Sequence, residues 1–101
     1  MERLKAQLNI LSKKHSFEIL DKLSQEPKYI SQISREMKIP FTTILQRINE
    51  LEKAGFIKII EQVDETSKRP VKKVRIINFK IDLSPSVIHQ LMADDKEFKV
   101  I

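Results

Sequence analysis

One segment constrains the fold of this chain more than any other, and it ends at Gly55, the only glycine among 101 residues. Apolar residues recur at i, i+4 and i+7 through residues 41–53, and this spacing predicts an amphipathic helix with one buried face. These residues are Ile44, Ile48 and Leu51. Pro40 suits the start of the helix, because the N–H group that proline lacks has no partner in a first turn. Gly55 suits its end, because glycine readily adopts the left-handed conformation that turns the chain out of a helix.

The segments around this helix predict a helix-turn-helix followed by a hairpin. Upstream, Ser31 can cap a short helix that reaches Met37, and residues 38–40 form a tight turn into the longer helix. Downstream, residues 56–63 and 71–79 are rich in isoleucine and valine, and a polar loop separates them. This pattern predicts two antiparallel strands with a long tip, which would form a wing behind the helices. Lys28–Ile30 is long enough only for a fragment of a strand.

Additional helices are predicted at both ends of the chain. Residues 1–14 carry one apolar stripe, and residues 15–23 continue with a second apolar face. Ser84 followed by Pro85 is a typical helix start, and we expect a helix over residues 84–92, with a loose tail over 93–101. The predicted fold class is therefore mainly α with a small antiparallel β-hairpin (α+β), in a single domain over residues 1–101 with its winged core at 15–79.

Two motifs carry a family resemblance. They are ISREMKI at residues 33–39 and TTILQRINELEKAGF at residues 42–56, and the Leu-Glu-x-Ala-Gly-apolar ending of the second is the more specific. Over roughly residues 15–79 the chain resembles the winged helix-turn-helix transcription regulators, particularly the ArsR-like group. The resemblance implies a DNA-binding regulator without enzymatic activity. Two departures are Lys38, where the family often has glycine, and Glu50, an acid on the presumed DNA face.

The outward side of the longer helix is the predicted DNA-binding face. Its residues are Thr42, Thr43, Gln46, Arg47, Asn49 and Glu50. A recognition helix places its N-terminal residues nearest the base edges of the major groove. Gln46 could pair with adenine, Arg47 with guanine or a phosphate, and threonine methyl groups with thymine, whereas Glu50 would have to accept a hydrogen bond from cytosine. The alternative is an ordinary surface helix, which is also polar on its outer side.

Basic residues gather in the predicted wing, residues 64–73. They are Lys68, Arg69, Lys72 and Lys73. A wing of this kind reaches phosphates or the minor groove, and Arg69 is the best candidate for insertion. The alternative is a hairpin loop that is lysine-rich for solubility. The formal net charge of +5 favours a polyanionic partner, either nucleic acid or a membrane surface.

Several classes of function are not supported by the sequence. The chain has no cysteine, so a disulfide, a thiolate zinc site and the thiolate sensing motif of metal-responsive ArsR members are excluded. His15 and His89 are far apart and lack a convincing acid partner, so we predict no metal site and no cofactor. No apolar run approaches the ~20 residues that span a bilayer. We predict a non-enzymatic cytoplasmic protein, associated with the nucleoid, whose small-molecule effector, if any, is unknown.

The terminal helices are candidates for a homodimer interface. The residues are Leu4, Leu8, Leu11, Val87, Ile88 and Leu91. In ArsR-like proteins the terminal helices of two subunits pack together, and the resemblance implies the same here; the alternative is that they close the core of one chain. The predicted function is sequence-specific binding of double-stranded DNA by a dimeric transcriptional regulator. Two alternatives stay open: a winged-helix protein–protein interaction module, and a sequence-neutral architectural nucleic-acid-binding protein.

Overall fold

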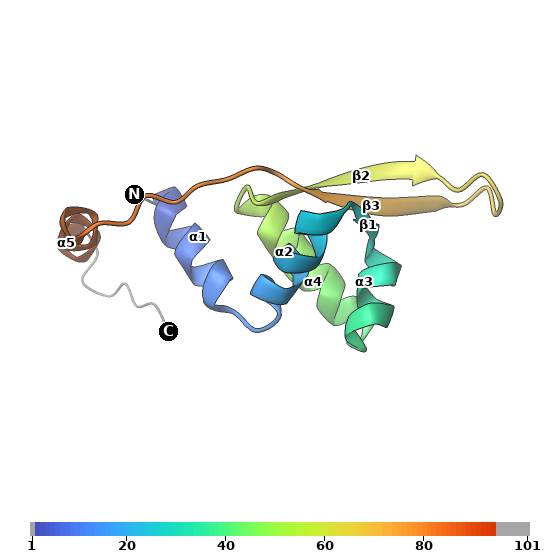
Figure 1. Cartoon of the computed structure of the whole chain (residues 1–101), viewed down its shortest axis with the longest axis horizontal. Coiled ribbons are helices and arrows are strands. Elements are labelled where there is room, and N and C mark those ends of the chain that lie inside the picture. The colour runs from blue at the N-terminus through green and yellow to red at the C-terminus, as the bar shows by residue number, and fades with distance from the viewer. Residues whose placement is uncertain (1, 95–101) are drawn as a thin grey trace.

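The computed structural model describes residues 2–94 (Figure 1). Within this range the chain forms five helices and a three-stranded sheet. In order they are α1 (Glu2–Ser12), α2 (Ser16–Gln25), β1 (Lys28–Tyr29), α3 (Ile30–Met37), α4 (Phe41–Lys53), β2 (Ile57–Val63), β3 (Pro70–Ile76) and α5 (Pro85–Asp94). The predicted fold class, mainly helical with an antiparallel hairpin and an additional helix at each end, is confirmed.

The sheet consists of the β2–β3 hairpin with β1 added along one side. The strand order is β1–β3–β2, and every pairing is antiparallel. The hairpin register runs from Ile57 opposite Ile76 to Val63 opposite Pro70. The second strand therefore begins one residue earlier than predicted and ends at Ile76 rather than at residue 79. One further hydrogen bond follows, from Ile77 N–H to Phe56 O at 2.9 Å, but β2 begins only at Ile57, so the paired register ends at Ile76.

The core lies between helices α2, α3 and α4 and one face of the hairpin (Figure 1). Its fully buried members are mainly β-branched or leucine side chains from all of these elements: Ile19, Leu23, Ile30, Ile33, Ile44, Ile48, Leu51, Ile57 and Val74. Phe56 is also fully buried, and its ring meets that of Phe79 edge to face, with centroids 4.6 Å apart. The chain beyond β3 is thus held against the start of β2 by an aromatic pair.

Local chemistry sets the end of α4 and the start of α5. Gly55 has a φ of +90°, the conformation expected at the end of α4. The Val87 N–H donates to Ser84 Oγ at 3.3 Å, as the predicted cap of α5 requires. The predicted cap at Ser31 is wrong: α3 begins at Ile30, and Tyr29 occupies the N-cap position without a side-chain hydrogen bond. The strand pairing of Tyr29 with Lys73 carries the chain directly into the helix.

The two terminal helices differ slightly from their predicted limits. Helix α1 ends at Ser12 rather than at residue 14, because the chain turns there: Lys13 N–H donates to Ile10 O and the buried Ser16 hydroxyl donates to the same carbonyl, at 2.6 Å. Helix α5 continues to Asp94, two residues further than predicted. The rest of the predicted tail, residues 95–101, lies outside the described residues. Among the helices of residues 2–94, none has both the length and the apolar character needed to cross a membrane.

Candidate nucleic-acid interface

The turn between α3 and α4 is tight because it is closed by both backbone and side-chain hydrogen bonds. Lys38 adopts a left-handed conformation, with a φ of 57° and a ψ of 41°, and thus takes the role that glycine often has at this position. The Ile39 N–H donates to Ser34 O at 3.1 Å, and the Ser34 hydroxyl donates back to Ile39 O at 2.6 Å. Pro40 then occupies the N-cap position, and α4 begins at Phe41. The turn keeps a regular shape, at the cost of a strained backbone at Lys38.

Helix α4 divides into a buried side and a polar side. Ile44, Ile48 and Leu51 have no exposed surface, as predicted. On the opposite side Thr42, Gln46 and Asn49 are exposed and, together with Leu45, Glu50 and Lys53, line a shallow groove of about 460 Å³ along the helix. Thr43 is exposed but lies outside this groove. The fold therefore presents a continuous polar strip on the helix that follows the turn.

The β2–β3 hairpin extends far beyond the helices, and its tip is internally braced (Figure 1). Asp64 organises the tip: its carboxylate accepts hydrogen bonds from Ser67 Oγ at 2.9 Å and from Thr66 N–H at 3.2 Å. The Ser67 hydroxyl and the Thr66 amide lower the pKa of Asp64 below its ordinary value. Lys68 has a φ of 59°, and both Lys68 and Arg69 are exposed. The acid that partly offsets the charge of the tip therefore also shapes it.

Comparison with known proteins decides what this arrangement is. Residues 17–59, from the first turn of α2 to the third residue of β2, match the family model described as bacterial regulatory protein, arsR family. Residues 17–59 form an arsR-family helix-turn-helix domain. A domain of this family implies DNA binding and transcriptional regulation, and the family is not enzymatic. A search of curated proteins found no match.

In this arsR-family domain, α3 and α4 are the two helices of the helix-turn-helix, and the predicted resemblance is confirmed. The predicted limits, residues 15–79, were wider than the match. The wing tip and β3 lie beyond residue 59, and the fold adds them as the hairpin described above. The predicted contacts of individual residues with DNA are taken up below as proposals.

Two residues of the predicted DNA face bind to other parts of the chain instead of standing free. Arg47 Nη1 lies 2.8 Å from Glu50 Oε1, and Arg47 Nε donates to the carbonyl of Lys14 at 3.0 Å. Glu50 Oε2 lies 2.6 Å from Lys13 Nζ. The Arg47 side chain is only 16% exposed. These contacts explain the acid on the outward side of the arsR-family helix: Glu50 has two basic partners within the chain, from α4 itself and from the α1–α2 turn.

The four basic residues predicted for the wing do not share one surface. Lys68 and Arg69 stand at the tip, whereas Lys72 and Lys73 are neighbours on β3 and therefore point to opposite faces of the hairpin. Lys72 lies on the same face as the buried Val74 and lines a groove beside the start of α4. Lys73 Nζ lies 5.4 Å from the centroid of the Tyr29 ring.

The groove that Lys72 lines has a volume of about 370 Å³ and lies where α3, α4 and the wing meet. Its other lining residues are Tyr29, Ile30, Ser31, Phe41, Leu45, Pro70 and Val71. The sequence reasoning did not identify Tyr29, Ser31 or Phe41 as site residues. Phe41 extends the apolar stripe of α4 by one turn, which predicts burial, yet it is 46% exposed because it precedes the point where α4 enters the core. This groove forms because the hairpin passes near the first turn of α4, and the sequence gives no local signal of that contact.

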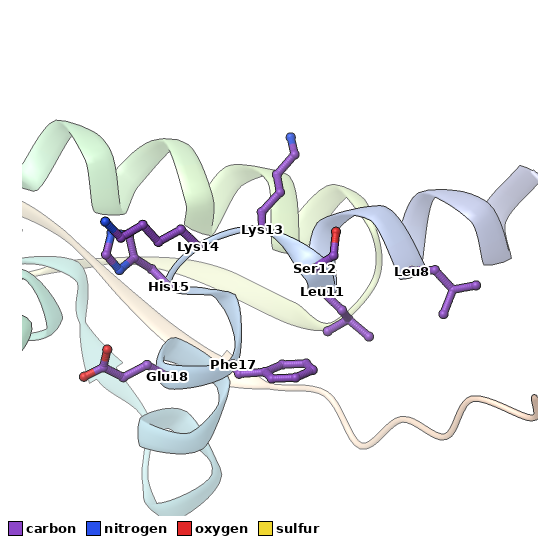
Figure 2. Close-up of a pocket in the computed structure, with 8 residues that line it drawn as sticks. All are labelled: Leu8, Leu11, Ser12, Lys13, Lys14, His15, Phe17 and Glu18. Carbon is purple, nitrogen blue, oxygen red and sulfur yellow. The ribbon is translucent and has the colours of Figure 1, made fainter. Parts of the chain in front are cut away.

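A second apolar surface lies between α1 and α2 (Figure 2). Leu8 and Leu11 from α1 are half-buried, and Phe17 from α2 is 69% exposed. Figure 2 shows these three side chains on the same side of the two helices, whereas Lys13 points away from them. In the sequence, Phe17 is part of the apolar face predicted for residues 15–23. It is exposed because the α1–α2 turn places the first turn of α2 outside the core.

Helix α5 stands at the opposite end of the molecule from the wing tip (Figure 1). The three predicted interface residues on α5 differ in exposure. Ile88 is 48% exposed, Val87 is half-buried, and Leu91 is only 3% exposed within the single chain. Ile88 therefore does not belong to the interior of the single chain. Met92, 49% exposed, extends the exposed apolar surface one turn further along α5.

Acidic and basic groups elsewhere serve the fold. Lys28, almost fully buried, is 3.4 Å from Glu26 Oε1 and 3.2 Å from Glu36 Oε1. Burial alone would lower the pKa of Lys28, but these two carboxylates raise it overall; hydrogen bonds from Gln32 and Lys28 lower the pKa of Glu36. Within residues 2–94, no three histidine, aspartate or glutamate side chains come together as a metal site would require.

Proposed function

We propose that this protein is a dimeric transcriptional regulator that binds double-stranded DNA in a sequence-specific manner, with α4 in the major groove. The observation that carries the proposal is the polar strip on α4. Thr42, Gln46 and Asn49 are exposed along one line, while the other side of the same helix is fully buried. A helix held in this way presents a rigid set of hydrogen-bonding side chains, as direct readout of base edges requires.

The predicted contacts on α4 are now divided between two roles. Thr42 and Thr43 stand in the first turn, where methyl groups can contact thymine, and Gln46 and Asn49 have amides that pair well with adenine. Arg47 and Glu50 are different, because each is bound within the chain. We assign Arg47 and Glu50 to holding the helix and not to reading bases.

The wing supplies contacts that do not depend on sequence. Lys68 and Arg69 at the braced tip would bind the backbone or enter the minor groove, and Lys72 faces the side on which α4 begins. The overall charge of +5 adds to the attraction. Such binding weakens steeply as salt rises, because each phosphate contact releases condensed counterions.

Dimerisation would bring two copies of α4 to one operator. Exposed apolar side chains support it: Phe17 on α2, next to the half-buried Leu8 and Leu11 of α1, and Ile88 with Met92 on α5. Leu4 and Val87 are half-buried next to these surfaces, and Leu91 would support α5 from within. A two-fold dimer binds half-sites roughly 34–36 Å apart, one helical turn. A regulator with a DNA target of this kind would act in the cytoplasm, on the nucleoid.

The deciding experiment is selection of bound duplexes from a random pool, combined with light scattering of the free protein at micromolar concentration. A pseudo-palindromic sequence, bound far more tightly than random DNA by a protein of dimeric mass, is the expected result. Binding with a steep salt dependence but no sequence preference would point to an architectural protein instead. Absence of measurable binding at low salt would contradict the proposal and favour a protein–protein interaction module.

A further inference from the structure

Helix α1 and the turn that follows it contact the C-terminal end of the recognition helix α4. Near the start of α1, the Arg3 guanidinium lies so close to Gly55 that a Cβ atom on residue 55 would be 2.7 Å from Arg3 Nη2. In the middle, Gln7 Nε2 donates to Ala54 O at 3.2 Å and so caps the end of α4. Beyond its end, Lys13 Nζ lies 2.6 Å from Glu50 Oε2.

On the α4 side all of these contacts meet residues 50–55, which are the last turn of α4 and the two residues after it, so they fix α1 against this end of α4. An 11-residue helix is about 16 Å long, and the contacts lie near both of its ends as well as at its middle. Ile10 is 5% exposed and joins the hydrophobic core from the same helix. Arg47 adds a further tie, because it holds Glu50 and the Lys14 carbonyl together. The C-terminal end of α4 is partially negative. The Arg3 guanidinium, which is positive, and the Gln7 N–H, which is a hydrogen-bond donor, both lie at this end.

We propose that α1 is a brace that sets the distance and angle between the two recognition helices of the dimer, and that Gln7, Lys13, Arg47 and Glu50 are its positioning residues. The inference rests on the proposed function, because it requires a dimer that joins through α1 and reads two half-sites. If α1 packs against its partner, the orientation of α4 relative to the dimer axis depends on the α1–α4 contacts. These residues then determine which spacing of half-sites the protein accepts, without contacting a base.

The dependence on half-site spacing is measurable, because each added base pair both displaces and rotates one half-site relative to the other. Two inserted base pairs displace a half-site by roughly 7 Å and rotate it by roughly 70° about the helix axis. A rigidly braced dimer cannot follow this change and binds through only one subunit. Loss of the second contact removes an avidity of about a hundredfold. A dimer with a loosened brace can reorient one α4 and recover part of this avidity.

The test compares two double variants of the full chain that differ only in their contacts to α4. The variant Gln7→Ala/Lys13→Met removes the amide bond to Ala54 and the ion pair to Glu50. The control Asn9→Ala/Lys14→Met likewise removes one side-chain amide and one lysine from the same region. Among residues 2–94 neither Asn9 nor Lys14 has a side-chain hydrogen bond or ion pair. The probe is the duplex selected by the unmodified protein, with its half-sites at the selected spacing or separated by two more base pairs.

We expect the unmodified protein and the control to lose about a hundredfold in affinity on insertion, and the brace variant to lose about tenfold. At the selected spacing the brace variant should bind about threefold more weakly, because it must order α4 on binding. Light scattering should show that all three remain dimers. A merely structural role would weaken binding to both duplexes equally and leave the ratio between them unchanged.

An unchanged hundredfold ratio in the brace variant would overturn the inference while leaving the proposed function in place. If the double variant is unfolded in a thermal melt, the same ratio is measured for Lys13→Met alone, against Lys14→Met, and a ratio equal to that of the unmodified protein overturns the inference. If selection produces no duplex with two half-sites, the inference and the proposed function both fail.

Discussion

Lys72 and Lys73 form a natural matched pair for testing the wing. They have the same charge and stand side by side on β3, yet they point to opposite faces of the hairpin. Lys72 lines the groove beside the first turn of α4, and Lys73 lies over the Tyr29 ring. If DNA lies along the face that α4 presents, Lys72→Met should remove a phosphate contact and Lys73→Met should not.

The size of the effect follows from counterion release. One phosphate contact contributes about 0.9 to the slope of log affinity against log salt, which corresponds to about eightfold in affinity at 0.1 M salt relative to 1 M. A dimer carries two wings, so Lys72→Met should lower the slope by about 1.8 and the affinity by about 60-fold at 0.1 M salt. Lys73→Met should change affinity by less than about twofold but cost about 0.5 kcal/mol of stability through the lost contact with Tyr29.

The assay is fluorescence anisotropy with the selected duplex at several salt concentrations, with a thermal melt of each variant as the check on folding. Equal losses of affinity for the two variants would show that the charge of the wing acts at long range and that neither face of the hairpin contacts DNA preferentially. A Lys72→Met protein with an unchanged salt slope would refute the placement of DNA on the α4 side of the hairpin.

Three other outcomes concern the backbone and the wing tip. Gly55→Ala should lower the free energy of unfolding by about 1–2 kcal/mol, mainly through the left-handed backbone; an unchanged denaturant midpoint would contradict this. Lys38→Gly should raise it by about 0.5–1 kcal/mol, seen as a higher melting temperature, because glycine relieves the strain at the α3–α4 turn. The lowered pKa of Asp64 means that its stabilisation of the tip is present above the ordinary carboxyl pKa and is lost as pH falls through the lower, folded-state value. The amide NMR signals of Thr66 and Ser67 should therefore shift as pH falls through the folded-state pKa of Asp64, and Asp64→Asn should abolish this shift. A shift retained in that variant would show that another group titrates.

Much of the helix-turn-helix could be predicted from sequence because its signals are local. The limits of α4 follow from Pro40 and Gly55, its buried side follows from the spacing of three apolar residues, and Ser84 marks the start of α5. Each depends on the conformational preference of one residue or on a period of 3.6. The strip of Thr42, Gln46 and Asn49 follows from the same period, and so does the family resemblance.

The parts that could not be predicted depend on segments distant in the chain. Arg47 and Glu50 look like DNA-reading residues until α1 and its turn fold back and place Lys13, 37 positions before Glu50, within 2.6 Å of the carboxylate. Phe17 and Phe41 belong to apolar stripes, but each lies where its helix extends beyond the core. The sequence by itself determined which residues form the recognition helix and which of its sides is buried. Only the tertiary structure decided which polar residues on the other side remain free to bind DNA, because an ion pair satisfied within the chain depends on where a distant helix comes to rest.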